Sequence, residues 1–247
     1  MTFRSVLAAE WIKVCTARST VWTPVVTVVL VVGLSVFVGA TESLQPDDTV
    51  LGGSLTGTVL GQLGAAVFGV LVMSGEYGTG MLRATLAAAP RRGTVLAAKA
   101  VVVATVTVAA GLIGGCAAYG IGVVMLSGQG YAPGRPMPAL LGVGGAVAAA
   151  GLLGLAFGTI LRHSAGAITT MIAIILVPSL IGPLFGDLQR WVGGASPMAA
   201  LQKMTQTSDA APDAVGSLGA WPSLSLVCAY TAVALLAAAL LFRRRDA

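Results

Sequence analysis

Six long stretches of this sequence contain no charged residue, and they constrain the fold more than any other feature. Even the shortest has about 23 residues, and about 20 apolar residues in a helix cross the ~30 Å hydrocarbon core of a bilayer. The stretches do not alternate apolar and polar residues as the strands of a transmembrane barrel do. They predict an all-α, polytopic membrane protein with six transmembrane helices near residues 20–40, 55–74, 101–125, 138–160, 165–186 and 222–242. The uncharged runs are Ser19–Thr41, Thr49–Gly75, Ala100–Gly134, Pro136–Leu161, Ser164–Gly186 and Ala214–Phe242.

The composition excludes a water-soluble fold. Apolar residues make up 56% of the 247 residues and charged residues only 9%, whereas a soluble domain has roughly 25% charged residues. The net charge is +5, but the sequence has no basic helix with interleaved aromatic residues, so we expect no nucleic-acid binding. In a membrane protein, Lys and Arg collect instead in the cytoplasmic segments.

The basic residues predict the orientation. With the N-terminus inside, the inner segments hold 11 of the 14 Lys and Arg residues, and the outer segments hold only Arg135, Arg190 and Lys203. This bias predicts a multi-pass protein with both termini in the cytoplasm. The inner basic residues are Arg4, Lys13, Arg18, Arg83, Arg91, Arg92, Lys99, Arg162, Arg243, Arg244 and Arg245.

Two segments outside the spans are expected to form helices of their own. Residues 1–19 mix Trp11 and other apolar residues with Arg4 and Lys13, and this predicts an N-terminal interfacial amphipathic helix with Trp11 at headgroup level. Residues 20–247 then form the six-span domain. Within that domain, an outer segment at about 187–221 is expected to form short helices against the outer leaflet.

Small residues and prolines predict how the spans pack. In the second run a small residue recurs at every fourth position, which allows another helix backbone to approach closely. Pro178 and Pro183 predict a kink or break near the outer end of the fifth span. The expected packing residues are Gly57, Gly61, Ala65, Gly69, Gly111 and Gly115.

The sequence offers little for catalysis. A P-loop needs Gly-x-x-x-x-Gly-Lys-Ser/Thr, and none of the three lysines has that context. One histidine and three cysteines without a motif, Cys15, Cys116 and Cys228, predict no metal site. No span centre carries an ionisable residue, which argues against a proton-coupled carrier. We therefore expect a non-catalytic chain whose driving force comes from elsewhere.

The inner segment between the second and third spans has a distinct pattern. Residues 79–88 are expected to form a short helix that Thr79 caps and Pro90 ends. Four of its residues, Met81, Leu82, Thr85 and Leu86, share one face, which is mostly apolar. Such a face suits docking to a partner and equally suits a helix lying on lipid headgroups.

Two segments resemble the permease subunits of ABC-2 exporters of the small actinobacterial type. The first is Glu10-Trp11-x-Lys13 followed by Arg18-Ser19-Thr20. The second runs from Glu76-Tyr77-Gly78-Thr79 through Arg83, Thr85-Leu86, Pro90-Arg91-Arg92 and Val95-Leu96 to Ala98-Lys99. It departs from the family pattern in that Gly78 follows Tyr77 directly.

The resemblance implies a function that the residues alone do not give. It implies a permease that pairs with a second, identical or related copy and docks on a separate ATPase, where ATP and Mg bind. The docking residues would be Thr79, Met81, Leu82, Arg83, Thr85 and Leu86. Glu76, Arg91, Arg92, Glu10, Trp11 and Lys13 would support them, with Glu76 balanced by Arg83 or Arg92. Pro178 and Pro183 would belong to the outer gate.

The cargo is expected to be an amphipathic or lipid-like molecule such as a drug, an antibiotic or a lipid. The alternative is a membrane scaffold or channel that is not coupled to an ATPase.

Overall fold

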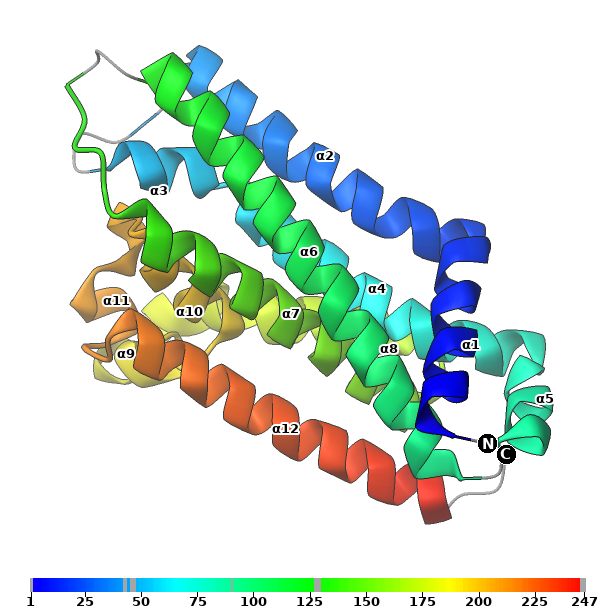
Figure 1. The fold of residues 1–247 in the computed structure, drawn as a ribbon. Helices are drawn as coiled ribbons and strands as arrows, with labels where there is room; N and C mark the ends of the chain where they lie inside the picture. Colours follow the sequence, from blue (N-terminus) through cyan, green and yellow to red (C-terminus); the bar gives the residue numbers. More distant parts are fainter. Residues whose placement is uncertain (1, 42–43, 45–47, 90, 127–129, 245–247) are drawn as a thin grey trace.

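In a computed structural model, the chain is a bundle of helices (Figure 1). The structure describes residues 2–41, 44, 48–89, 91–126 and 130–244, and within these residues no strand forms. The helices are α1 Phe3–Thr16, α2 Arg18–Thr41, α3 Val50–Leu55, α4 Thr58–Thr79, α5 Met81–Ala88, α6 Arg92–Leu126, α7 Pro136–Leu161, α8 Ser164–Ile181, η1 Gly182–Leu188, α9 Gln189–Val192, α10 Pro197–Thr205, η2 Ser208–Ala210, α11 Pro212–Val215 and α12 Ala220–Arg244.

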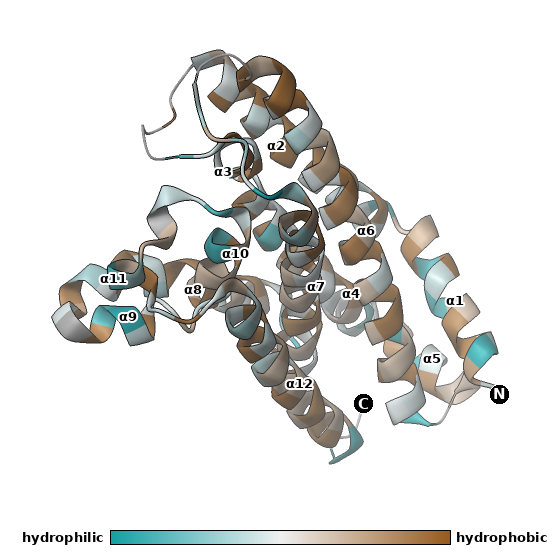
Figure 2. Ribbon diagram, turned by 60° about the vertical axis from the view of Figure 1, so that its left-hand side comes forward, coloured by the Kyte–Doolittle hydropathy of each residue, from teal (hydrophilic) through white to brown (hydrophobic). Residues whose placement is uncertain are grey.

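The prediction of six apolar, span-length helices is confirmed. They are α2, the pair α3 and α4, α6, α7, α8, and α12 with the residues just before it. The second run is divided: Thr49 caps α3 by accepting a hydrogen bond from the Gly52 amide at 2.9 Å, and α4 begins at Thr58 after a short break. Apolar residues dominate all the spans, while hydrophilic residues colour α1, α9 and the helix ends (Figure 2).

The two central helices, α4 and α7, run side by side with the most buried faces of the bundle. Gly69 of α4 faces α7 so closely that a Cβ there would overlap the carbonyl oxygen of Gly151. A Cβ on Gly154 of α7 would overlap the carbonyl oxygen of Ala66. Small residues at these positions therefore bring the two backbones into direct contact.

The other predicted packing residues, in the second run and in α6, face different neighbours. A side chain at Gly57 or Gly61 would meet Val31 of α2, and Ala65 is buried in the core. A Cβ on Gly111 of α6 would lie 3.1 Å from Cβ of Val147 in α7, and one on Gly115 would make an ordinary contact with Leu140. The small residues of the second run thus allow close packing of α4 against both α2 and α7.

The fifth span ends where its prolines predict. Pro178 lies inside α8, which stops at Ile181, and Pro183 lies in the first turn of the following 3-10 helix. Gly186 has φ of +52° inside this segment, a backbone conformation that glycine adopts without strain. The chain then turns into the short helices at the end of the bundle.

One short helix of the outer segment lies inside the protein, contrary to the expectation that this segment rests on the leaflet. Helix α10 packs against α7, α8 and α12, and Leu201 and Met204 are almost fully buried. Gln62 of α4, also fully buried, donates a hydrogen bond from Nε2 to the carbonyl oxygen of Pro197 at 3.0 Å. The apolar side chains of α10 are buried against α7, α8 and α12 instead of facing lipid.

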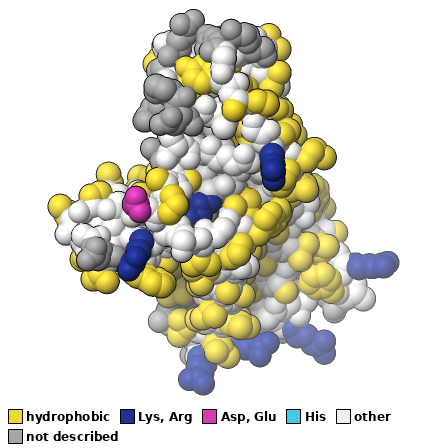
Figure 3. Space-filling model, turned by 90° about the vertical axis from the view of Figure 1, so that its left-hand side faces the viewer, with side chains coloured by type: hydrophobic (Ala, Val, Ile, Leu, Met, Phe, Trp, Pro, Cys, Tyr) yellow, Lys and Arg dark blue, Asp and Glu magenta, His cyan; other side chains and the backbone are white. Residues whose placement is uncertain are grey.

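The start of α1, the end of α12 and α5 lie together at one end of the bundle (Figure 1). Lys and Arg side chains line the lower rim of the molecule in Figure 3. The opposite end carries α3, α9 and α11 (Figure 1). We call the end that holds the start of α1 and the end of α12 the basic end.

Candidate functional site

Helix α1 lies across the basic end of the bundle and buries one face there. Val6, Glu10 and Val14 follow one another at four-residue intervals and are at most 8% exposed. The structure confirms a helix at the N-terminus, but not an amphipathic one, because the large apolar side chains of Trp11 and Ile12 are exposed on other faces. The middle residue of this buried face, Glu10, is charged.

Glu10 belongs to a buried ion cluster, which we define as Glu10, Lys13, Glu76 and Lys99. Lys99 Nζ of α6 lies 2.6 Å from Glu10 Oε2 of α1 and 2.8 Å from Glu76 Oε1 of α4. The side chains of Lys99, Glu10 and Glu76 are 1%, 3% and 8% exposed. One ammonium group thus joins three helices through two charge-assisted hydrogen bonds.

Lys13 closes the cluster from its open side. Its Nζ lies 2.7 Å from Glu10 Oε1 and 2.8 Å from Glu76 Oε1, and it donates a further hydrogen bond to Thr85 Oγ1 of α5 at 2.9 Å. Partial burial by itself lowers the pKa of Lys13, but the hydrogen bonds and negative charges of Glu10 and Glu76 outweigh it and raise the pKa above its ordinary value. The ammonium form is therefore favoured at neutral pH.

The four charges of the cluster cancel. Two carboxylates face two ammonium groups, so the cluster satisfies its buried charges locally. Glu76 Oε2 is buried and has no hydrogen-bond partner in the described part of the chain. Removing any one of the four charges leaves an uncompensated charge at a buried position, which is far more costly than exchanging the whole cluster for apolar groups.

Beside the cluster is a cavity of about 400 Å³ between α1, α4 and the start of α2. Lys13, Glu76, Thr79 and Met81 contribute to its wall together with apolar residues of α1 and α4. Part of the cluster is thus reached from the surface, although Lys99 itself is enclosed.

The structure brings together four of the residues predicted from sequence. Glu10, Lys13 and Glu76 form the ion cluster, and Thr85 hydrogen-bonds to it. Lys99 was not predicted as a site residue. It ends the second of the two segments that resemble the exporter family, which we call the family-like segments (residues 10–20 and 76–99). The signal for it was its place: a lysine at the start of an uncharged run is costly unless a carboxylate pairs with it.

The predicted partners of Glu76 were wrong. Arg83 lies exposed on α5. Arg92 donates a hydrogen bond to the carbonyl oxygen of Phe242 at 3.0 Å, and its guanidinium lies 5.9 Å from the centre of the Phe242 ring. Lys13 and Lys99 pair with Glu76 instead, because α1 and α6 pack on either side of it.

Tyr77, the neighbour of Glu76, anchors the end of α4 to a different helix. The guanidinium carbon of Arg162 lies 5.3 Å from the centre of the Tyr77 ring, a cation–π geometry. Arg162 follows the last residue of α7 in a left-handed conformation. Adjacent residues of one family-like segment therefore fix α4 to α1 and α6 on one side and to α7 on the other.

Helix α5 begins later than predicted and has a different cap. Thr79 does not cap it: Thr79 ends α4 and donates from Oγ1 to the carbonyl oxygen of Gly75 at 2.9 Å. Gly80, with φ of +70°, separates the two helices, because glycine takes this left-handed conformation without a steric penalty. The residue predicted to end α5, Pro90, lies outside the described residues.

The apolar face of α5 points into the bundle and not toward a partner or the membrane surface. Leu82 is 3% exposed and packs with Phe68, Val72 and Leu96, and Leu86 is partly buried against the same core. The prediction of an exposed apolar face was therefore wrong for these leucines, because α1, α4 and α6 already cover them. The exposed residues of α5 are Met81, Arg83, Ala84, Ala87 and Ala88, and we call them the outer face of α5.

The remaining predicted support residues lie apart from the ion cluster. Trp11 is 45% exposed on α1. Arg91 is exposed just before α6, and with Arg92 it lines a separate cleft beside the end of α12. None of the three is joined to the four cluster residues by a described ion pair.

Comparisons do not assign the site. No protein-family model matches the chain, and no curated protein is similar to it. Within the described residues, no three His, Cys, Asp or Glu side chains gather closely enough to hold a metal ion.

Proposed function

We propose that this chain is the membrane-spanning permease subunit of an ATP-driven exporter of the ABC-2 type. The observation that carries the proposal is the ion cluster: Glu10 and Lys13 come from one family-like segment, and Glu76 and Lys99 come from the other. The two segments that resemble the family are thus parts of a single structural unit. A buried charged cluster of this kind is costly, and a role in holding α5 in place accounts for it.

In this proposal α5 is the coupling helix that a separate ATPase contacts. Its outer face combines the exposed Met81 and Arg83 with three exposed alanines. The Lys13–Thr85 hydrogen bond and the buried Leu82 connect α5 rigidly to α1, α4 and α6. Movement imposed on α5 by ATP closure therefore passes to three helices at once.

The remaining parts of the assembly follow from the same proposal. ATP and Mg bind the partner ATPase, and a second copy of the permease, identical or related, completes the pair. Pro178, Pro183 and the segment at about 187–221 form the outer gate. The cargo is an amphipathic or lipid-like molecule, since the spans offer an apolar path.

The proposed setting is the bacterial plasma membrane, with both termini in the cytoplasm. The gathering of Lys and Arg at the basic end supports this orientation. Helix α1 then lies at the inner membrane surface, with the exposed Trp11 and Ile12 toward the lipid headgroups.

Copurification of the full-length, tagged protein from its native membranes tests the proposal. We expect a vanadate-sensitive ATPase to copurify, and Arg83→Glu with Ala87→Glu to reduce the bound ATPase activity at least about tenfold, because charges placed in an interface core are poorly tolerated. The matched control is Arg190→Glu at the opposite end, which should keep the ATPase.

Two results would contradict the proposal. One is purification of the intact protein with no ATPase bound. The other is solute movement across reconstituted vesicles in the absence of any nucleotide, which would favour the channel or scaffold alternative.

A further inference from the structure

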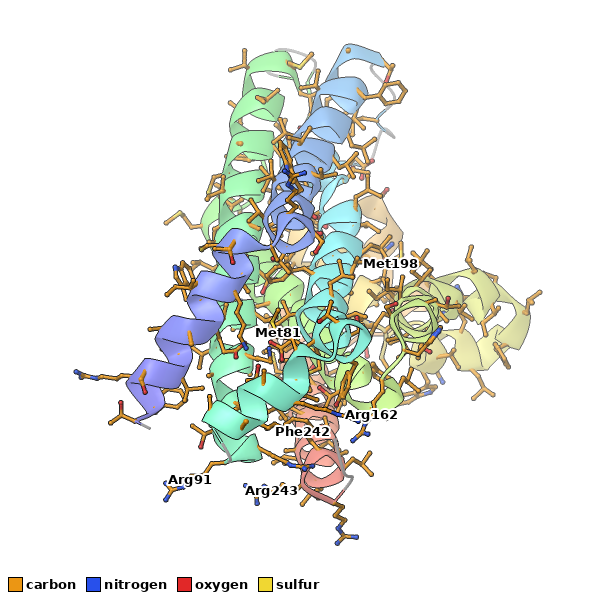
Figure 4. The ribbon with its side chains drawn as sticks, turned by 90° about the vertical axis from the view of Figure 1, so that its right-hand side faces the viewer. Met81, Arg91, Arg162, Met198, Phe242 and Arg243 are labelled. Carbon is orange, nitrogen blue, oxygen red and sulfur yellow. The ribbon has the colours of Figure 1, made fainter. Side chains whose placement is uncertain are left out.

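A second site lies at the basic end, apart from the ion cluster. A cleft of about 870 Å³ opens where α1, the start of α6 and the end of α12 meet. Three arginines line it: Arg91 and Arg92 at the start of α6, and Arg243 from the last turn of α12. Arg91 and Arg243 both extend beyond the same end of the bundle (Figure 4).

Two of the three arginines of this cleft, Arg91 and Arg243, have no acidic partner in the described part of the chain. The acidic residues described at the basic end are Glu10 and Glu76, and both are neutralised by Lys13 and Lys99. The guanidinium groups of Arg91 and Arg243 take part in no described ion pair or hydrogen bond, although the Arg91 carbonyl accepts from the Thr94 amide at 2.9 Å. The cleft wall as described contains no acidic residue.

The position of Arg243 adds to this imbalance. A Cβ on Gly93 would lie 2.9 Å from Arg243 Nη2, so the guanidinium packs over the first turn of α6. The N-terminus of a helix carries a partial positive charge and backbone amides without an acceptor in the helix. A guanidinium held against it is unfavourable unless an anion lies between or beside the two.

Apart from Gly93 and Thr94, the rest of the cleft wall is apolar. Phe3 and Val6 of α1, Ala89 and Ala97 line it. Helix α6 has 35 residues and is therefore about 52 Å long, which exceeds the ~30 Å hydrocarbon core. Its first turn carries Arg92 and precedes the uncharged stretch that begins at Ala100, so we place this turn outside the hydrocarbon core, with apolar and cationic groups side by side.

We propose that this cleft binds the headgroup of an anionic phospholipid, with the lipid phosphate held by Arg91, Arg243 and the first turn of α6. Arginine binds phosphate oxygens in a bidentate manner. The apolar wall formed by Phe3 and Val6 accommodates the glycerol and the upper part of the acyl chain. The inference is independent of the proposed transport function.

The test measures lipid association with the full-length protein in mixed bilayers. Spin-labelled phosphatidylglycerol and phosphatidylcholine serve as probes, and their relative association constants are read from the immobilised fraction. We expect a preference for phosphatidylglycerol that Arg91→Gln and Arg243→Gln each lower about fivefold. The matched controls, Arg135→Gln and Arg190→Gln, each remove the same single charge from the opposite end and should leave the preference unchanged.

Each other outcome decides against the lipid site. An equal loss in the control pair would mean that net charge alone attracts the lipid. Competition by millimolar inorganic phosphate or glycerophosphate, with no preference between the two lipids, would mean a site for free phosphate. Thermal unfolding in detergent separates a loss of binding from a loss of fold, since both arginines are exposed and their removal should leave the melting temperature unchanged.

Discussion

Lys99 and Glu10 are 89 positions apart, yet Lys99 Nζ and Glu10 Oε2 lie 2.6 Å apart in the interior of the basic end. This pair joins the N-terminal helix to the long span α6. Because both side chains are almost fully buried, neither can replace its partner with water.

Removal of one charge from this pair should destabilise the protein strongly. We expect Lys99→Met to lower the free energy of unfolding by about 3–5 kcal/mol, because two carboxylates then face Lys13 alone. The double variant Glu10→Gln with Lys99→Met keeps a neutral Lys13–Glu76 pair and should recover about 1–3 kcal/mol relative to the sum of the single losses. Unfolding in a denaturing-detergent titration measures all three. Strictly additive single effects would contradict the coupling.

The orientation of α5 gives a prediction with an internal control. Leu82→Ala removes a buried side chain and should cost about 2–5 kcal/mol, whereas Met81→Ala, on the neighbouring residue that is 48% exposed, should change stability by less than about 0.5 kcal/mol. The same titration measures both. If the order of the two effects is reversed, α5 presents its other face to the bundle.

The contact between α4 and α7 depends on glycine. Gly154→Ala places a methyl group against the carbonyl oxygen of Ala66 and should cost about 1–3 kcal/mol, since the two backbones must separate. The matched control is Gly120→Ala in α6, where the added methyl meets no atom within 4 Å. This control should be neutral or stabilising by up to about 1 kcal/mol, because alanine is the better helix former. Thermal melting in detergent distinguishes the two.

The raised pKa of Lys13 predicts an alkaline loss of stability. Burial lowers this pKa, and Glu10 and Glu76 raise it further than burial lowers it, so the folded value lies above 10.5. A base with a higher pKa in the folded state contributes stability that is fully present below its unfolded pKa and is lost as the pH rises through its folded pKa. The stability difference between wild type and Lys13→Met should thus be constant from neutral pH to about pH 10 and shrink above it. A difference that does not shrink as the pH rises above about pH 10 would show that Lys13 is not the group responsible.

The native cysteines report the orientation directly. Cys15 is exposed on α1, whereas Cys116 and Cys228 lie within the apolar helices α6 and α12. With the basic end inside, a membrane-impermeant maleimide should label Cys15 only after the cells are permeabilised. Arg135→Cys on the opposite side is the control and should react in intact cells. Labelling of Cys15 in intact cells would invert the proposed topology.

The six spans could be predicted because the absence of charge over 20 or more residues depends on local sequence alone. Their ends were harder. Helix α6 begins at Arg92 and not near residue 101. The prediction started at the uncharged stretch, but the helix continues through the basic residues that precede it. The division of the second run into α3 and α4 was missed, since small residues there gave no clear stop signal.

The partners of Glu76 could not be predicted from spacing. Arg83 and Arg92 are near it in sequence, but Lys13 and Lys99 reach it because α1 folds back over the junction of α4 and α6. Periodicity likewise located the apolar face of α5 around Leu82, yet it did not reveal that neighbouring helices cover that face. Both misses concern packing between elements distant in the chain.

The ion cluster also sets an order of events during biosynthesis. Glu10 and Lys13 leave the ribosome first, while Lys99 emerges 89 residues after Glu10. Until α6 has been inserted, the carboxylate of Glu10 lacks its buried counter-ion and stays solvated, because its desolvation alone is too costly. The first helix to be made therefore cannot dock until the third span is in place.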